Sequence, residues 1–241
     1  MIKLHSIETL GALDGPGLRT IFFLQGCPLR CLYCHNPDTW SASKGTVVTE
    51  EAIVEKALAY KTYTQPKGGV TFSGGEPLLQ AKALIPLFRN LKEHGFHIAL
   101  DTSGYGMPSP KILEELLSLT DLVLLDIKHE DQKEWEKITG KKMDRYWMFK
   151  ELLLASQAKI WIKHVVVPGL TDQGAHLRAL EREVLTFPHE RVEKFELLPY
   201  HSLGKLKYDQ LGLEYPLADT PDMDWEKLCE LKKNLTIDCL I

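Results

Sequence analysis

Short apolar runs alternate with amphipathic segments along most of the chain. The apolar runs are each followed by turn-forming residues, as buried strands are, and begin near Thr20, Val70, His97, Leu122, Ile160 and Val192. The intervening segments have the apolar spacing of amphipathic helices and cover residues 49–60, 80–95, 109–119, 145–157 and 172–185. Strands and helices that alternate in this way predict parallel strands joined by right-handed crossovers.

Two segments lie outside this repeat. One is the N-terminal segment, which ends in LDGPGLR (13–19), and the other is a C-terminal helix over 222–234 followed by a short strand over 235–241. No linker, low-complexity tract or block of charge interrupts the chain, so residues 1–241 are predicted to form one domain. The pattern fits either a doubly wound sheet or a barrel of βα units, and both place their chemistry beyond the C-terminal ends of the strands.

Composition argues against several classes of function. The 29 basic and 33 acidic residues are interspersed and give a formal charge of −4, so no basic stripe suits nucleic acid or an anionic membrane surface. The N-terminus lacks the apolar core of a signal peptide, and no apolar run is long enough to span a bilayer. We therefore expect a cytoplasmic protein. Five cysteines, three of them clustered, favour metal or redox chemistry there over a disulfide framework.

The cluster lies in GCPLRCLYCHN (26–36), where Cys27, Cys31 and Cys34 follow the first strand with the spacing C-x3-C-x2-C. A purely structural role would leave three thiols prone to oxidation, and a redox pair of Cys31 and Cys34 would leave Cys27 unexplained. Structural zinc needs four ligands, and His35 is poorly placed as the fourth because it is adjacent to Cys34. Thiolates are the natural ligands of iron–sulfur clusters, and a four-iron cluster with three cysteines leaves one iron open.

These motifs also resemble a known family. C-x3-C-x2-C with Tyr33 before the last cysteine is the signature of radical S-adenosylmethionine enzymes, and residues 26–40 are similar to the activating enzymes of glycyl radical enzymes. The resemblance continues in order through DGPGLR, SGGEPLLQ, LDTSG, LLDIK, VVVPG and LLPYH. It implies an α/β fold, a partial (β/α)6 TIM-like barrel of parallel strands with short N- and C-terminal additions.

The resemblance further implies a reaction. A reduced 4Fe-4S cluster would cleave S-adenosylmethionine, and the resulting 5′-deoxyadenosyl radical would remove hydrogen from a backbone glycine of a partner enzyme. Such an oxidoreductase needs an electron donor such as reduced flavodoxin. Because no ferredoxin-like insertion follows Cys34, pyruvate formate-lyase is the favoured partner. A different glycyl radical enzyme is the alternative partner, and a zinc-binding structural module is the alternative from another class.

By the same resemblance, Cys27, Cys31 and Cys34 are the catalytic cluster ligands. The residues implied to contact S-adenosylmethionine are Tyr33, His35, Gly74, Gly75, Glu76, Asp101, Thr102, Asp126, Lys128 and His201. Side-chain alternation independently places Asp126 and Lys128 on one face of their strand.

Other expectations at the site are less direct. Asp101 and Asp126 could together hold a monovalent cation beside the cofactor carboxylate. Asp14 and Arg19 of the DGPGLR segment are expected near an incoming target peptide. Ser103 and Lys163 stand where relatives commonly carry asparagine and arginine.

Overall fold

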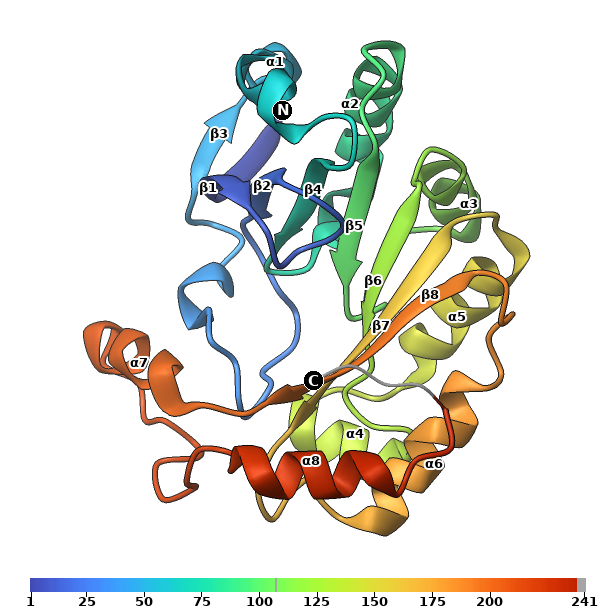
Figure 1. Cartoon of the computed structure of the whole chain (residues 1–241). Coiled ribbons are helices and arrows are strands. Elements are labelled where there is room, and N and C mark those ends of the chain that lie inside the picture. The colour runs from blue at the N-terminus through green and yellow to red at the C-terminus, as the bar shows by residue number, and fades with distance from the viewer. Residues whose placement is uncertain (107, 238–241) are drawn as a thin grey trace. The chain divides into compact units, whose positions relative to one another are not determined.

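The computed structural model describes residues 1–106 and 108–237 (Figure 1). The chain divides into two compact units, each made of several segments. Unit 1 comprises Met1–Pro28, Thr39–Leu125 and Asp144–Lys159, and unit 2 comprises Leu29–Asp38, Asp126–Met143 and the described chain from Ile160 onward. The expected single domain over residues 1–241 stays a prediction.

Unit 1 is built on an open sheet with the strand order β3-β1-β2-β4-β5-β6. Its strands are β1 (Ile2–Gly11), β2 (Arg19–Leu24), β3 (Thr46–Val48), β4 (Gly69–Gly74), β5 (Ile98–Thr102) and β6 (Leu122–Asp126), the last of which ends at the first residue of unit 2. β1 is antiparallel to β2 and β3, whereas β2, β4, β5 and β6 are parallel. β3 pairs only with β1 among the described strands, so this sheet does not close into a ring.

The parallel strands of unit 1 are buried along nearly their whole length. This is the reason that they read as continuous apolar runs, since helices cover parallel sheets on their faces. Phe22 of β2 stacks on Phe72 of β4 with ring centroids 5.3 Å apart, and Phe72 packs against Phe88 at 4.8 Å. These rings join the sheet to the helix that carries Phe88.

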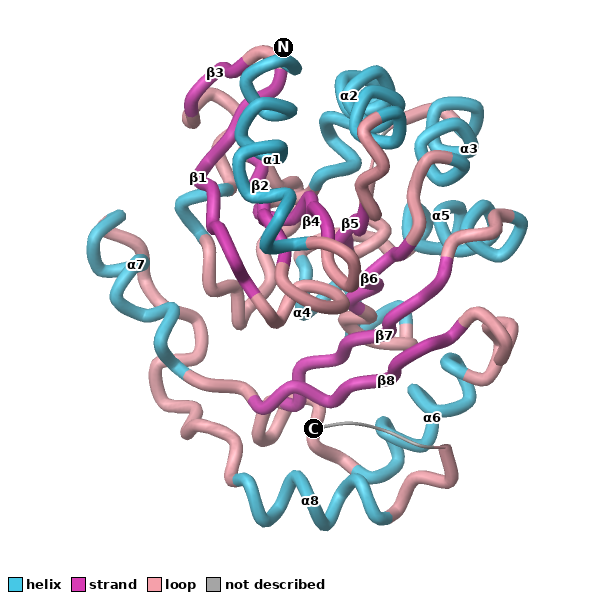
Figure 2. Tube along the Cα trace, turned by 45° about the horizontal axis from the view of Figure 1, so that its top comes forward, coloured by secondary structure: helices cyan, strands magenta, loops and turns pink. Residues whose placement is uncertain are grey.

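The helices of unit 1 are α1 (Glu50–Thr64), α2 (Ala81–Glu93), α3 (Pro110–Ser118) and α5 (Asp144–Ala155), with a short 3-10 turn, η2 (Pro77–Gln80), before α2. The side chain of Thr49 caps α1 by accepting a hydrogen bond from the amide of Ala52 at 3.3 Å, as expected from the sequence. α2 and α3 lie side by side (Figure 2). The helices therefore form where the apolar spacing predicted them.

Unit 2 contains a parallel pair of strands, β7 (Lys159–Val166) and β8 (Val192–Pro199), connected through helix α6 (Gly174–Val184). Lys159, the first residue of β7, belongs to unit 1. The register pairs Ile162 with Phe195 and Val166 with Pro199. The remaining elements are short: η1 (Pro37–Thr39), whose last residue belongs to unit 1, α4 (Gln132–Thr139), η3 (Ser202–Gly204), α7 (Lys205–Leu211) and α8 (Trp225–Lys233).

All six expected strands are present as β2 and β4–β8, and the expected helices are present as α1, α2, α3, α5, α6 and α8. The sequence did not predict β1, β3, α4 or α7. The expected C-terminal strand is not formed over residues 235–237, and its last four residues lie outside the described chain. No helix of the described residues is long and apolar enough to cross a membrane.

Candidate active site

In unit 1 the expected site residues gather where the parallel strands end. Cys27 follows β2, Gly74 ends β4 and Gly75 follows it, and Asp101 and Thr102 end β5. Parallel strands have their C-terminal ends at one edge of a sheet, so these residues share that edge.

The two glycines let the end of β4 approach the start of the cysteine loop. The amide of Glu76 donates to the carbonyl of Gly26 at 2.8 Å, and a Cβ atom on Gly75 would lie 2.2 Å from that carbonyl oxygen. A Cβ atom on Gly74, whose φ is 106°, would lie 2.3 Å from the amide nitrogen of Leu24. Glycine is therefore required here by the packing of backbone on backbone, before any ligand is considered.

Glu76 is buried, with 1% of its surface exposed, and its carboxylate accepts four hydrogen bonds within unit 1. Oε1 accepts from the amide of Leu78 at 3.1 Å and from the hydroxyl of Thr102 at 2.5 Å. Oε2 accepts from the amide and the hydroxyl of Ser103 at 3.0 and 2.6 Å. Burial raises the pKa of Glu76, while the hydrogen bonds from Ser103 and Thr102 oppose that rise. Glu76 thus ties the loop after β4 to the end of β5.

Ser103 helps to hold the Glu76 carboxylate. The sequence had indicated only that serine stands where relatives commonly carry asparagine. Both its amide and its hydroxyl donate hydrogen bonds to the Glu76 carboxylate. Nearby, the hydroxyl of Ser73 donates to Oδ2 of Asp101 at 2.8 Å. Asp101 and Thr102 are both therefore held in place by polar contacts to the preceding strand and its loop.

Arg19 does not face outward as expected of a residue that recognises a partner. Arg19, the last residue of the DGPGLR segment, is fully buried. Its Nε donates to the hydroxyl of Thr71 at 2.6 Å, and its Nη2 donates to the carbonyl of Val70 at 2.5 Å. Nη1 donates to the carbonyl of Pro16 at 3.1 Å. Burial lowers the pKa of Arg19 to about 10. The expectation is wrong for Arg19, because its guanidinium is occupied in holding the segment onto β4.

The cysteine segment of unit 2 is anchored to helix α4. The amide of Arg30 donates to the carbonyl of Thr139 at 2.8 Å, and the amide of Leu32 donates to the carbonyl of Ile138 at 3.0 Å. Carbonyls in the last turn of a helix have no partner within the helix, so α4 has acceptors to offer. A short helix that the sequence did not predict therefore positions the residues around Cys31.

Local hydrogen bonds also shape the turn that carries Cys31 and Cys34. The amide of Cys34 donates to the carbonyl of Cys31 at 3.1 Å, and the amide of Asn36 donates to Sγ of Cys34 at 3.4 Å. Burial raises the pKa of the Cys31 thiol to about 12, although the ammonium group of Lys128 lowers it in part. A buried thiolate is stable only beside a cation, which iron bound by these thiols would supply. No cysteine of the described chain is in a disulfide, so the donor set fits a cluster.

Lys128, Asp126 and Tyr33 meet in unit 2. Nζ of Lys128 lies 2.5 Å from Oδ2 of Asp126, which confirms that the two side chains share a face, and 5.3 Å from the centroid of the Tyr33 ring. Burial would lower the pKa of Lys128, but the carboxylate of Asp126 outweighs burial and raises it. Oδ1 of Asp126 and the hydroxyl of Tyr33 are buried and have no hydrogen-bond partner within the described chain. Such atoms are suited to a polar ligand.

His35 and His201 form a stacked pair in unit 2, with ring centroids 4.3 Å apart. Nε2 of His35 lies 2.9 Å from the backbone carbonyl of His201 and must be its donor, since a carbonyl only accepts. Burial lowers the pKa of His35 and so favours the neutral ring. Nδ1 of His201 is buried and has no hydrogen-bond partner among the described residues. Lys207 of α7 bonds Oδ1 of Asn36 at 2.7 Å, which fixes the chain just after His35.

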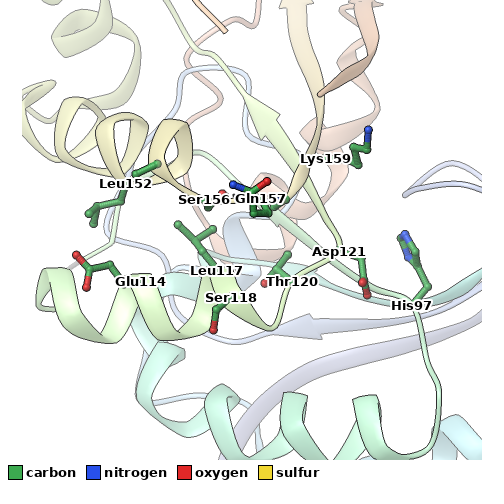
Figure 3. Close-up of a pocket in the computed structure, with 12 residues that line it drawn as sticks. His97, Glu114, Leu117, Ser118, Thr120, Asp121, Leu152, Ser156, Gln157 and Lys159 are labelled. Atoms are coloured by element: carbon green, nitrogen blue, oxygen red, sulfur yellow. Dashed lines mark hydrogen bonds between the residues drawn. The ribbon is translucent and has the colours of Figure 1, made fainter. Parts of the chain in front are cut away.

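A cavity of about 810 Å³ in unit 1 is lined by none of the expected site residues. It lies beside α3 and α5, where His97, Asp121 and Lys159 mark the N-terminal ends of strands (Figure 3). Asp121 already bonds Nζ of Lys92 at 2.6 Å and the amide of Ile98 at 2.8 Å. This cavity is therefore at the opposite ends of β5 and β6 from the candidate site.

Comparison with known proteins supports an iron–sulfur site. Residues 13–146 match the family described as a 4Fe-4S single cluster domain, which is more than half of the chain. The pyruvate formate-lyase-activating enzyme of Clostridium pasteurianum is 48% identical over 236 residues, which cover 98% of this chain and 97% of that one.

Solved structures bear on the fold. Streptococcus suis SuiB bound to S-adenosylmethionine has a TM-score of 0.61 at 17% identity and covers 87% of this chain and 44% of its own. A radical SAM methyltransferase from Sphaerobacter thermophilus has a TM-score of 0.61 at 16% identity and covers 90% of this chain and 63% of its own. These likenesses confirm the expected α/β fold class with parallel strands.

Proposed function

Since this chain belongs to the family of pyruvate formate-lyase-activating enzymes, we propose that it installs a glycyl radical in a partner enzyme. The observation that carries the proposal is the 48% identity over 98% of the chain, together with three cysteines in one short loop. When bound, a 4Fe-4S cluster would supply the electron that cleaves S-adenosylmethionine into methionine and the radical that takes hydrogen from a glycine.

The cysteine residues Cys27, Cys31 and Cys34 would hold the cluster and leave one iron for the cofactor. The amide of Asn36, which donates to Sγ of Cys34 at 3.4 Å, is a contact of the kind that tunes the potential of iron–sulfur clusters. Cys31 is half-buried, which limits the access of water to the thiolate. The protein therefore contributes ligands, a shielded environment and a hydrogen bond to sulfur.

The cofactor would be held by residues that offer unsatisfied polar atoms. Oδ1 of Asp126, the hydroxyl of Tyr33 and Nδ1 of His201 are buried atoms without a hydrogen-bond partner in the described chain. Lys128 and His35 would complete this set in unit 2. For unit 1, the resemblance alone implies that Gly74, Gly75, Asp101 and Thr102 contact S-adenosylmethionine. Glu76 would act by holding Thr102 in place, since its carboxylate already has four donors.

The target enzyme, the electron donor, a bound cation and the cellular compartment are part of the same proposal. Pyruvate formate-lyase is the favoured target, because this is the enzyme named in the relatives, and reduced flavodoxin or a similar donor would supply the electron. A monovalent cation held by Asp101 and Asp126 beside the cofactor carboxylate is proposed from the sequence, because two carboxylates that serve one site would otherwise repel each other. The reducing cytoplasm is the compartment that would keep clustered thiols available for iron.

Anaerobic reconstitution with iron and sulfide tests the proposal. The loaded protein, reduced in the presence of S-adenosylmethionine, should yield 5′-deoxyadenosine and should generate the paramagnetic signal of a glycyl radical on added pyruvate formate-lyase. The Cys31→Ala variant should lose cluster iron and both products. Cys229→Ala is the matched control, because Cys229 is a free cysteine on α8, and it should behave as the wild type.

Two outcomes would count against the proposal in different ways. A fully loaded protein that makes no 5′-deoxyadenosine would refute the reaction. Cofactor cleavage without a radical on pyruvate formate-lyase would leave the reaction intact and point to another glycyl radical enzyme as the target.

A further inference from the structure

Three metal-binding side chains meet in unit 2, outside the set proposed for S-adenosylmethionine. His129 and Glu130 follow Lys128 in the sequence, and His176 lies on α6. One ligand atom from each of the three lies within 4.8 Å of the others. Nδ1 of His176 is 2.7 Å from Oε2 of Glu130, and Nδ1 of His129 is 3.2 Å from the same oxygen. Only 5% of His129 and 7% of His176 is exposed.

A chain of hydrogen bonds fixes the orientation of the His176 ring. Nδ1 of His164 lies 2.7 Å from the carbonyl of Ile127, so it must be protonated and donate. His164 is fully buried and makes no ion pair in the described chain, which favours its neutral form because an unpaired buried charge is costly. Nε2 of His164 is then an acceptor, and Nε2 of His176, 3.0 Å away, donates to it. The proton of a neutral His176 is thereby placed on Nε2, and Nδ1 carries the lone pair.

That lone pair and the Glu130 carboxylate are close but not joined. Nδ1 of His176 and Oε2 of Glu130 are both buried atoms that lack a hydrogen-bond partner among the described residues, despite their separation of 2.7 Å. Their separation is that of an ion pair when the imidazole is protonated, and a bound metal ion would take the place of that proton. Two electron-pair donors held side by side in this way are arranged as ligands of one cation.

We propose that His129, Glu130 and His176 form a second metal site, separate from the cysteine loop, for a divalent cation of the zinc type. Two imidazoles and one carboxylate are a common zinc set that leaves a position open, and imidazole ligands disfavour magnesium and calcium. His164 would act from behind the site, because metal-binding histidines usually donate their second N–H to a fixed acceptor. At present Nδ1 of His129 accepts from the amide of Asp131 at 3.0 Å, and a metal would replace that bond.

The location suggests a structural purpose for the ion. The carbonyl of Ile127, which ends the hydrogen-bond chain, lies between Asp126 and Lys128 in the sequence. His129 and Glu130 continue the same segment. An ion bound to this segment and to α6 would fix the backbone that presents Asp126 and Lys128.

Zinc analysis of the cluster-loaded protein tests this site directly. After anaerobic dialysis against Zn²⁺, the wild type should retain about one zinc ion per chain in addition to its iron. His176→Ala and Glu130→Gln should each lower zinc retention about tenfold or more without changing the iron content. His94→Ala removes an exposed histidine of unit 1 and should retain zinc as the wild type does.

A thermal measurement separates loss of the site from loss of the fold. Zn²⁺ should raise the unfolding temperature of the wild type and of His94→Ala, because a ligand that binds the native state stabilises it, and should not raise that of Glu130→Gln. Glutamine keeps the size of the side chain, so this variant should still unfold cooperatively. Equal zinc retention in wild type and both site variants would overturn the proposal, and so would a wild type that retains none.

Discussion

At the scale of single residues, the carboxylate of Glu76 is held by donors that lie far from it in the sequence. Thr102 and Ser103 stand 26 and 27 positions away and supply three of its four hydrogen bonds. The family resemblance implied a ligand contact at Glu76. Nothing in the SGGEP motif itself indicates that Thr102 and Ser103 are its hydrogen-bond partners. By contrast, the pairing of Asp126 with Lys128 was predictable from their spacing of two residues, although β6 ends at Asp126 and Lys128 lies just beyond the strand.

Glu76→Gln should lower the free energy of unfolding by about 1–3 kcal/mol, because the amide NH₂ group would face donors and leave buried partners unsatisfied. Urea denaturation of the reconstituted protein measures this change. Glu114→Gln is the control, since Glu114 is exposed on α3 and should change stability little. Equal stability of the Glu76 and Glu114 variants would show that the four hydrogen bonds do not matter.

Arg19→Lys provides a second test at this scale. Lysine keeps the positive charge but cannot donate in the three fixed directions that reach Thr71, Val70 and Pro16. We expect a loss of about 1–3 kcal/mol in the free energy of unfolding. The same change at Arg178, an exposed position of α6, should have almost no effect. A wild-type stability for Arg19→Lys would show that the guanidinium hydrogen bonds do not hold the segment onto β4.

At the scale of elements, the sequence predicted those that bury a continuous apolar surface. β2, β4, β5 and β6 were found because parallel strands covered on both faces read as apolar runs. β1 and β3 expose much of their length, and α4 and α7 span only 8 and 7 residues. Such short or half-exposed elements depend on tertiary contacts, which no local pattern records.

Helix α4 illustrates what was missed, because its last carbonyls hold the cysteine segment. The helix ends at Gly140, whose φ of 71° is left-handed, so a residue with a Cβ atom is strained there. Gly140→Ala should cost about 1 kcal/mol of stability and should speed the loss of iron to a chelator. Gly174→Ala at the start of α6, where φ is not left-handed, should do neither. If Gly140→Ala lost iron at the wild-type rate, the end of α4 would not control how the cysteine segment holds iron.

At the scale of the whole molecule, the alternation of strands and helices was sufficient to predict the fold class. The division into two units was not predicted, because each unit is assembled from three separate stretches of chain. A boundary between consecutive domains leaves a linker of distinct composition, whereas these boundaries fall in a loop, inside the short turn η1, at the start of α5 and at the ends of strands. The sequence therefore offers no local feature from which the units could be recognised.

Removal of iron should lower the stability of the entire chain. Burial raises the pKa of the Cys31 thiol to about 12, so without metal the thiol is protonated. The native state then also loses the free energy that iron binding contributes to its stability. Each kcal/mol lost should lower the unfolding temperature by about 2–4 °C in a chain of this size. Calorimetry of loaded and chelator-treated protein under argon measures the difference. Cys31→Ala keeps the proposed zinc ligands, so any effect of the chelator that persists in this variant belongs to the second site. A loaded wild type that melts at the same temperature as its chelated form would contradict a cluster bound by these cysteines.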